Sequence, residues 1–549
     1  NQRNHASHHA TRLGTTAAVA VAVPSSPSPS SKNQFEIVGA EPPTVSWSRG
    51  EVQPPAFRDK WFAIAFLLHI VTVISAVIAF YPNLLSEISA NRTDNNADDD
   101  AAEDYSDKDN TSDDDNDDDG WMLGWLLTVF SVSLVGAPVL SMLVLGVMSR
   151  NAKKLLEGSL IFSIAINVIL MVVELVAGIP GGALMHAIMA ALLVWYSKSV
   201  WHRIPYAASN LKAAVTVIRL NGGITLVSLG ALMVLFVWTI AWTVAFTGTS
   251  LEPDLMTTKA TEHSCDANGN CVEPGDSQLT TLGGILYCLF FLSFYWTNEV
   301  IRNVVRTTVA GTVGTWIFSP SEASSFCSSG VTDSLTRSTT YSLGSICFGS
   351  LIVAVVQLIR NLLQSSARNR RNGIVSCIAQ CLLAFIEGLV RYFNKWAFVY
   401  VGLYGYSYLE AGKSVMELFQ ARGWSAIISD NLVNRLLSIC ILVIGLLTGV
   451  ASTIVSFIFE EAEHSDNGIL LPGFLTGFLI GMVMASLVLG VVSSAVDAII
   501  VCFAEAPGEF KENHPAIAQE MQTTWDAAWP TVDFNGVAMV SLDGGIGIV

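Results

Sequence analysis

The chain has 549 residues, of which 51% are hydrophobic and only 14% are charged. A soluble domain is typically about a quarter charged, so this composition excludes an ordinary soluble protein and predicts a membrane protein. The formal net charge of −17 comes mostly from one acidic segment, residues 94–119, and gives no reason to expect a nucleic-acid partner.

Residues 1–56 are rich in Ser, Pro, His and Ala, and we expect a disordered tail without a cleavable signal peptide. Apolar segments long enough to cross a bilayer as helices follow it. They do not alternate apolar with polar residues, as barrel strands do, so we predict an all-α polytopic transmembrane bundle. About ten spans are expected, at 61–81, 122–148, 158–178, 180–200, 223–247, 280–300, 341–363, part of 376–412, 433–458 and 471–503.

Basic residues beside the early spans predict the orientation, because cytosolic loops carry an excess of Lys and Arg. If the N-terminal tail is cytosolic, three basic stretches fall on the cytosolic side, at 58–60, 149–154 and 198–219. An even number of spans then makes 57–505 the transmembrane domain and 506–549 a cytosolic C-terminal tail.

The basic stretch 366–373 conflicts with this orientation, because simple alternation places it outside the cytosol. Either 301–318 inserts partly, or 364–393 is a cytosolic amphipathic helix, or the charge rule fails in this region. The sequence leaves these three alternatives open.

Two loops are expected outside the cytosol, the acidic loop 82–120 and the loop 248–279. The acidic loop contains the glycosylation sequons of Asn91 and Asn110. The second loop contains Cys265 and Cys271, which we expect to form a disulfide in an oxidising compartment.

Small residues in the last expected span predict close helix packing. Gly473, Gly477 and Gly481 recur every four residues, and this spacing lets two helix backbones approach each other. We interpret these glycines as a helix–helix seam.

Carboxylates inside apolar spans are costly, and they usually face the bundle interior or a water-filled cavity. Glu299 is the most informative, because Tyr295 and Trp296 lie four and three residues before it and share its helical face. A carboxylate beside aromatic rings suits an organic cation, which the rings attract by cation–π contact. The alternative is a plain ion pair with Arg302, three residues later.

Six further residues are candidates for substrate binding or coupling. Asp497 follows a stripe of small and polar residues that fits either a pore-lining face or a tight seam. Glu174 precedes the Gly/Pro-rich residues 178–182, which form either a turn or an interrupted helix of the kind transporters use. Trp238 and Trp242 are candidates for a cage wall or an interfacial belt, and Glu387 and Glu410 are further coupling candidates.

Motifs of soluble and membrane enzymes are missing from the sequence. It contains no HExxH, GxSxG, Walker A or kinase motif, so we expect no enzyme, no cofactor and no metal site. His69 and His186 are isolated histidines in apolar spans, where core packing is the default interpretation.

Four stretches resemble the choline transporter-like family, also called the plasma-membrane choline transporter or solute-carrier 44 family. They are TTVAGTVGTWIF (307–318), FNKWAFVYVGLYG (393–405), SAVDAIIVCFAEAP (494–507) and NHP (513–515). The similarity runs from Trp61 to the end of the last span, and the chain is most similar to the fungal and algal branch of the pH-nine-sensitive type. The family's Trp-Thr-x-Glu and VDxxxxCF patterns fall on Glu299 and Asp497.

The resemblance implies a ten-helix bundle that carries choline or a related cation such as ethanolamine by facilitated transport or proton exchange. We expect alternating access in the plasma membrane, with Glu299 and Asp497 neutralising the substrate or a counter-moving proton. Tyr295, Trp296 and Trp242 are the cation–π candidates. The alternatives are a non-transporting scaffold or sensor that uses its acidic loop, and a lipid-handling membrane protein.

Overall fold

The structure is a computed structural model, and it describes residues 51–103, 115–251, 280–368, 373–422, 428–463 and 468–530. Within these ranges every element is a helix and no strand is present, so the all-α prediction is confirmed there. Several expected features lie outside the described residues: the tail up to residue 50, residues 531–549, Asn110, Cys265 and Cys271. The side chain of Asn91 also lies outside them.

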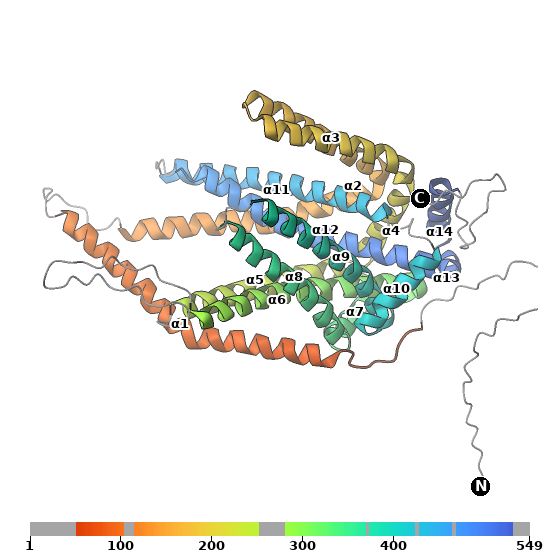
Figure 1. Cartoon of the computed structure of the whole chain (residues 1–549), viewed down its shortest axis with the longest axis horizontal. Coiled ribbons are helices and arrows are strands. Elements are labelled where there is room, and N and C mark those ends of the chain that lie inside the picture. The colour runs from red at the N-terminus through yellow and green to blue at the C-terminus, as the bar shows by residue number, and fades with distance from the viewer. Residues whose placement is uncertain are drawn as a thin grey trace, which may run out of the picture. The chain divides into compact units, whose positions relative to one another are not determined.

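The helices follow one another along the chain as Figure 1 labels them. They are α1 (Lys60–Glu103), α2 (Asp115–Val176), α3 (Pro180–Val200), η1 (Trp201–Arg203), α4 (Ile204–Leu220), α5 (Gly223–Ser250), α6 (Thr281–Phe318), η2 (Pro320–Glu322), α7 (Ser329–Thr339), α8 (Leu343–Arg368), α9 (Gly373–Tyr404), α10 (Tyr408–Arg422), α11 (Ile428–Glu463), α12 (Leu470–Glu505), α13 (Pro507–Asn513) and α14 (Pro515–Ala528).

Eight segments of the described residues are long and apolar enough to cross a membrane. They are Lys60–Pro82, Gly124–Val176, Pro180–Leu220, Gly223–Ser250, Thr281–Phe318, Leu343–Gln364, Leu432–Phe459 and Leu470–Glu505. The expected count of about ten spans is therefore not confirmed. Gly124–Val176 contains two of the expected spans, and its backbone leaves helical geometry at Asn151 (φ −127°, ψ 30°). The expected partial span at 376–412 overlaps α9, which is not among the eight.

The described parts of the acidic loop, residues 82–103 and 115–120, are helical where a loop was expected. α1 continues past Pro82 to Glu103, and α2 begins at Asp115. Extending an existing helix costs much less than nucleating a new one, so a transmembrane helix can continue into polar sequence.

The connection between α2 and α3 is a turn, which settles the alternatives for residues 178–182. α2 ends at Val176 and α3 begins at Pro180, and Gly178 has a φ of +76° between them. Glycine adopts this conformation without steric cost, and proline is favoured at the start of a helix.

α11 and α12 pack along the predicted glycine seam. An added Cβ at Gly473, Gly477 or Gly481 would lie 2.0, 2.0 or 1.8 Å from the hydroxyl oxygen of Ser456, Ser452 or Thr448, respectively. These three partners also recur every four residues, so each glycine faces a hydroxyl side chain one turn from the next. The seam interpretation of the glycines agrees with this packing.

α12 continues from the seam into the centre of the bundle. Every residue from Ser494 to Glu505 is buried, and the helix contacts α2, α4, α5, α6, α9 and α11. A helix that is enclosed on all sides can bring polar groups of several neighbours together. The site described below uses this half of α12.

The two described terminal segments attach to the same end of the bundle. The backbone N–H groups of Gln53 and Arg58 donate to the carbonyl oxygens of Tyr404 (2.8 Å) and Tyr341 (3.1 Å). Near the other terminus, Asn513 Nδ2 donates to the Ile317 carbonyl at the end of α6 (3.0 Å). The cytosolic location of both tails stays a prediction.

Candidate functional site

Glu299 lies in the interior, where α6 packs against α8 and α9. Its side chain is buried, and Oε1 accepts a hydrogen bond from Gln357 Nε2 of α8 (2.9 Å). The same oxygen forms an ion pair with Arg391 Nη1 of α9 (3.1 Å). The partner of Glu299 is therefore an arginine on another helix, and no contact with Arg302 is needed to explain its burial.

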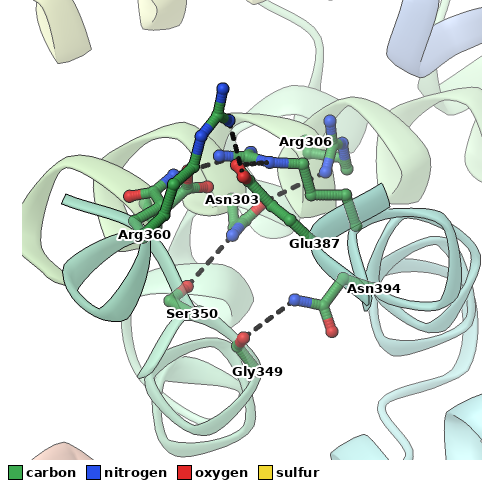
Figure 2. Close-up of polar contacts among 10 residues, drawn as sticks. Asn303, Arg306, Gly349, Ser350, Arg360, Glu387 and Asn394 are labelled. Atoms are coloured by element: carbon green, nitrogen blue, oxygen red, sulfur yellow. Dashed lines mark hydrogen bonds and ion pairs between the residues drawn. The ribbon is translucent and has the colours of Figure 1, made fainter. Parts of the chain in front are cut away.

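Glu387 continues this network along α9. Its two oxygens pair with Arg360 Nη1 of α8 (2.8 Å) and with Arg391 Nε (3.0 Å). Figure 2 shows Arg360 reaching across from α8 to Glu387. Arg391 thus bridges two carboxylates, Glu299 through one nitrogen and Glu387 through another.

Two neutral amides, Asn303 of α6 and Asn394 of α9, form further hydrogen bonds to α8. Asn303 Nδ2 donates to Ser350 Oγ (3.0 Å), and Asn303 Oδ1 accepts from Arg306 Nη1 (3.1 Å). Asn394 Nδ2 donates to the Gly349 carbonyl (2.8 Å), and Figure 2 shows both asparagines pointing toward α8. Buried polar groups are costly unless hydrogen-bonded, so these pairings hold the three helices in a defined register.

Asp497 supplies a second buried ion pair, between α12 and α9. Lys395 Nζ lies 3.2 Å from Asp497 Oδ1, and the side chains are 13% and 1% exposed. The ammonium also lies 4.3 Å from the ring centroid of Trp396. This pair is enclosed by protein on nearly all sides, so removing one partner would leave a buried charge.

Among the described residues of this cluster, the protein's own cations already neutralise the carboxylates. Arg391 pairs with both Glu299 and Glu387, Arg360 also pairs with Glu387, and Lys395 pairs with Asp497. In this conformation Arg391 and Lys395 therefore already compensate the charges of Glu299 and Asp497. The conformation described here holds the site in its ion-paired form.

The aromatic candidates separate into two environments. Tyr295 faces α8 with Glu299, because its hydroxyl contacts Asn361 Nδ2 one turn beyond Gln357. Trp296 instead donates from Nε1 to the Cys347 carbonyl (2.9 Å) and packs on Phe66 and His69 of α1, with ring centroids 5.3 and 4.9 Å away.

The tryptophans of α5 also contact rings of neighbouring helices. Trp238 lies 6.0 Å from His69, centroid to centroid. Trp242 Nε1 donates to the Phe290 carbonyl (2.8 Å), and its ring stacks on Phe246 at 5.1 Å. His69 is half-buried in an aromatic cluster, and its Nε2 also lies 3.1 Å from Thr297 Oγ1.

Glu174 contacts His186, which looked isolated in the sequence, across the α2–α3 turn. Glu174 Oε1 lies 3.5 Å from His186 Nε2, and His186 Nδ1 lies 3.1 Å from Asn167 Oδ1. The Glu174 carboxylate packs on Gly182, where an added Cβ would lie 2.6 Å from Oε2. The spacing along the chain gave no sign of this contact, because the turn at 178–182 brings the residues together.

Glu410 caps a helix. Its Oε2 accepts hydrogen bonds from the Ser407 hydroxyl (2.7 Å) and the Ser407 backbone N–H (3.3 Å) at the start of α10. The hydroxyl contact is the main cause that lowers the pKa of the Glu410 carboxyl below its ordinary value. This capping-box geometry explains the residue without a role in coupling.

Several polar residues of the network were missed in the sequence. Arg391 and Lys395 follow the predicted candidate Glu387 at four-residue spacing on one face of α9, which was a visible signal. Glu505, another buried carboxylate, accepts hydrogen bonds from the hydroxyl groups of Tyr400 (2.9 Å) and Tyr404 (2.6 Å). Four of the protein's cavities, of about 290 to 450 Å³, are lined by none of the expected substrate residues.

Comparison with known proteins identifies the family. A family profile described as plasma-membrane choline transporter matches residues 184–508, more than half of the chain. Protein PNS1 of Mycosarcoma maydis is 31% identical over 406 residues, covering 71% of this chain and 72% of the relative. Protein PNS1 of Debaryomyces hansenii is 26% identical over 410 residues, covering 71% and 78%. A CTL-like protein of Dictyostelium discoideum is 27% identical over 487 residues, covering 87% and 78%.

These matches confirm the resemblance that the four sequence stretches indicated. Together with the apolar helices, they show a multi-pass membrane protein with a transporter role. The chain belongs to the plasma-membrane choline transporter family.

Proposed function

We propose that the protein carries choline or a related small organic cation across the plasma membrane by alternating access. The observation that carries this proposal is the network of ion pairs between α6, α8, α9 and α12, in which the carboxylates are buried and Arg360 and Arg391 are partly exposed. Charges inside a membrane protein are costly and usually mark a substrate or ion pathway. Family membership supports the same conclusion, since members resembling this chain are choline transporter-like proteins.

Among the carboxylates of the network, Glu299 can lose its arginine partner at the lowest cost in free energy. Arg391 pairs with both Glu299 and Glu387, so it keeps one carboxylate when it leaves the other. Arg391, whose side chain is 41% exposed, then still has a carboxylate as its partner. The freed Glu299 can neutralise the incoming cation, and the Tyr295 ring on the same side of α6 can add cation–π attraction.

Asp497 and Lys395 are the second pair that the transport cycle would have to rearrange. Their contact joins α12 to α9, so breaking it would loosen the interface between these two helices. We assign Asp497 to the substrate or to a counter-moving proton, because a proton on the carboxylate would remove its attraction for Lys395. Alternating access then consists of exchanging protein ion pairs for substrate or proton contacts.

Radiolabelled choline uptake into liposomes containing the purified protein tests this proposal, with and without a pH gradient. Wild-type protein should show saturable uptake, and Glu299→Gln should lower it at least about tenfold. The matched control is Glu417→Gln, whose carboxylate pairs with Lys413 on the surface at 3.8 Å and is 64% exposed. Equal uptake by wild type, Glu299→Gln and empty liposomes would end the proposal.

A further inference from the structure

Arg435 is a membrane-embedded arginine without a counter-charge in the described part of the chain. It lies near the start of the spanning segment Leu432–Phe459 of α11. Its guanidinium lies 4.9 Å from the ring centroid of Tyr196 on α3. Within the described ranges, no carboxylate oxygen lies within 4.0 Å of it. Charged side chains in spans are normally paired, so this guanidinium calls for an anion from elsewhere.

Arg435 lines a cavity of about 370 Å³ that opens at the surface of the bundle. Three helices form its walls: α2 with Phe162, Ser163, Ile166 and Asn167, α3 with Leu193, and α11 with Arg435, Ser438, Ile439 and Leu442. All three helices belong to membrane-spanning segments at these positions, so the cavity opens toward the bilayer.

The neutral polar groups of this cavity already donate within their own helices. Ser163 Oγ donates to the Ser159 carbonyl (2.8 Å), and Asn167 Nδ2 donates to the Ser163 carbonyl (2.8 Å). Ser438 Oγ donates to the Asn434 carbonyl (2.9 Å). Arg435 is the charged residue of this lining, and its N–H groups donate to no residue of the described ranges.

We propose that this cavity binds an anionic phospholipid. The phosphate would accept hydrogen bonds from Arg435, since guanidinium groups bind phosphate oxygens through two parallel N–H donors. The position of Arg435 near the start of its span suits the depth of a headgroup. An acyl chain would lie against the apolar wall of Phe162, Ile166 and Leu442. The lipid would contact α2, α3 and α11 and so stabilise their packing.

Native mass spectrometry of the purified full-length chain tests this site, with dioleoyl phosphatidylglycerol and dioleoyl phosphatidylcholine as the two probes. Arg435→Gln should weaken phosphatidylglycerol binding about tenfold, the loss expected for a charge-assisted contact. Arg150→Gln is the matched control, because it removes the same charge from an exposed position that does not line the cavity. It should change the affinity by less than about twofold.

Leu193→Trp keeps Arg435 and fills part of the cavity, so it should also weaken phosphatidylglycerol binding. Thermal unfolding in detergent gives a second readout, since added phosphatidylglycerol should raise the Tm of wild type more than that of Arg435→Gln. Equal losses of phosphatidylglycerol affinity in Arg435→Gln and Arg150→Gln would show that the lipid responds to the overall charge of the protein. That result would overturn the proposal. Unchanged phosphatidylglycerol affinity in Leu193→Trp would overturn it as well, even if Arg435→Gln does not fold.

Discussion

The two halves of α12 hold their neighbours in different ways. The first half packs three glycines against Thr448, Ser452 and Ser456 of α11, so that a single added methyl group would collide. The second half, from Ser494 to Glu505, is buried among several helices and carries Asp497 and Glu505, which contact α9 through Lys395, Tyr400 and Tyr404.

This difference indicates which interface can move. The glycine seam depends on shape, and close-packed shapes have few alternative arrangements of similar energy. Ion pairs and hydrogen bonds can exchange one partner for another, as Arg391 can between Glu299 and Glu387. We therefore expect α11 and α12 to stay together during transport, while contacts of α9 with α6, α8 and α12 change.

Breaking the Lys395–Asp497 pair should have the largest effect on stability. Lys395→Met leaves Asp497 buried without this cation, and losing one partner of a buried pair typically costs about 3–5 kcal/mol. Thermal or denaturant unfolding in detergent measures this loss. Lys413→Met is the control, because that lysine is 79% exposed and should change the free energy of unfolding by less than about 0.5 kcal/mol. A Lys395→Met protein as stable as the control would contradict the buried-pair account.

Adding a methyl group to the seam should have the next largest effect. In Gly477→Ala the new Cβ would lie 2.4 Å from Ser452 Cβ and 2.9 Å from the Thr448 carbonyl oxygen, so the backbones must separate. We expect a loss of about 1–3 kcal/mol in the free energy of unfolding. Gly490→Ala in the same helix meets no atom within 4 Å and should be neutral or slightly stabilising. Equal Tm values for the two variants would mean that the seam is not close-packed in the membrane.

Glu299→Gln should separate stability from transport. Arg391 retains Glu387 in this variant, so the free energy of unfolding should fall by less than about 2 kcal/mol while choline uptake falls much further. Unfolding and uptake of the same preparation give both numbers. A stability loss as large as that of Lys395→Met, with uptake falling only as much as the amount of folded protein, would show that Glu299 has a structural role.

The smallest effect is expected at the helix cap. The pKa of Glu410 is lowered in the folded protein by the Ser407 hydroxyl, so its contribution is present above the ordinary carboxyl pKa and is lost as the pH falls through the lowered value. Because the side chain is exposed to solvent, Glu410→Ala should cost at most about 0.5 kcal/mol at neutral pH. The difference from wild type should vanish in acid. A difference that persists there would rule out the carboxylate as its cause.

The sequence predicted the contacts that depend on periodicity within one helix. The glycine seam followed from a spacing of four, and the apolar spans followed from their length. The partners of Glu299 could not be predicted in this way, because Arg391 lies on α9 and Gln357 on α8, far along the chain.

The shared helical face of Tyr295, Trp296 and Glu299 did not reveal which neighbouring residues each of them contacts. Helix geometry allows all three to point in similar directions, but neighbouring helices decide the outcome. α8 contacts all three residues, through Gln357, Asn361 and the Cys347 carbonyl. Trp296 also packs against rings of α1. Such choices depend on how helices pack, which a single sequence does not reveal.

A comparison of two inhibitors of choline uptake tests the central claim most directly. They are choline itself and its uncharged carbon isostere, 3,3-dimethyl-1-butanol. If the buried carboxylates exchange a protein cation for a substrate cation, unlabelled choline should inhibit radiolabelled choline uptake into liposomes at least about tenfold more strongly than the isostere. Glu299→Gln should reduce that preference, and Glu417→Gln should leave it intact. Equal inhibition by the charged and the uncharged compound would show that shape alone selects the substrate, and would contradict the account.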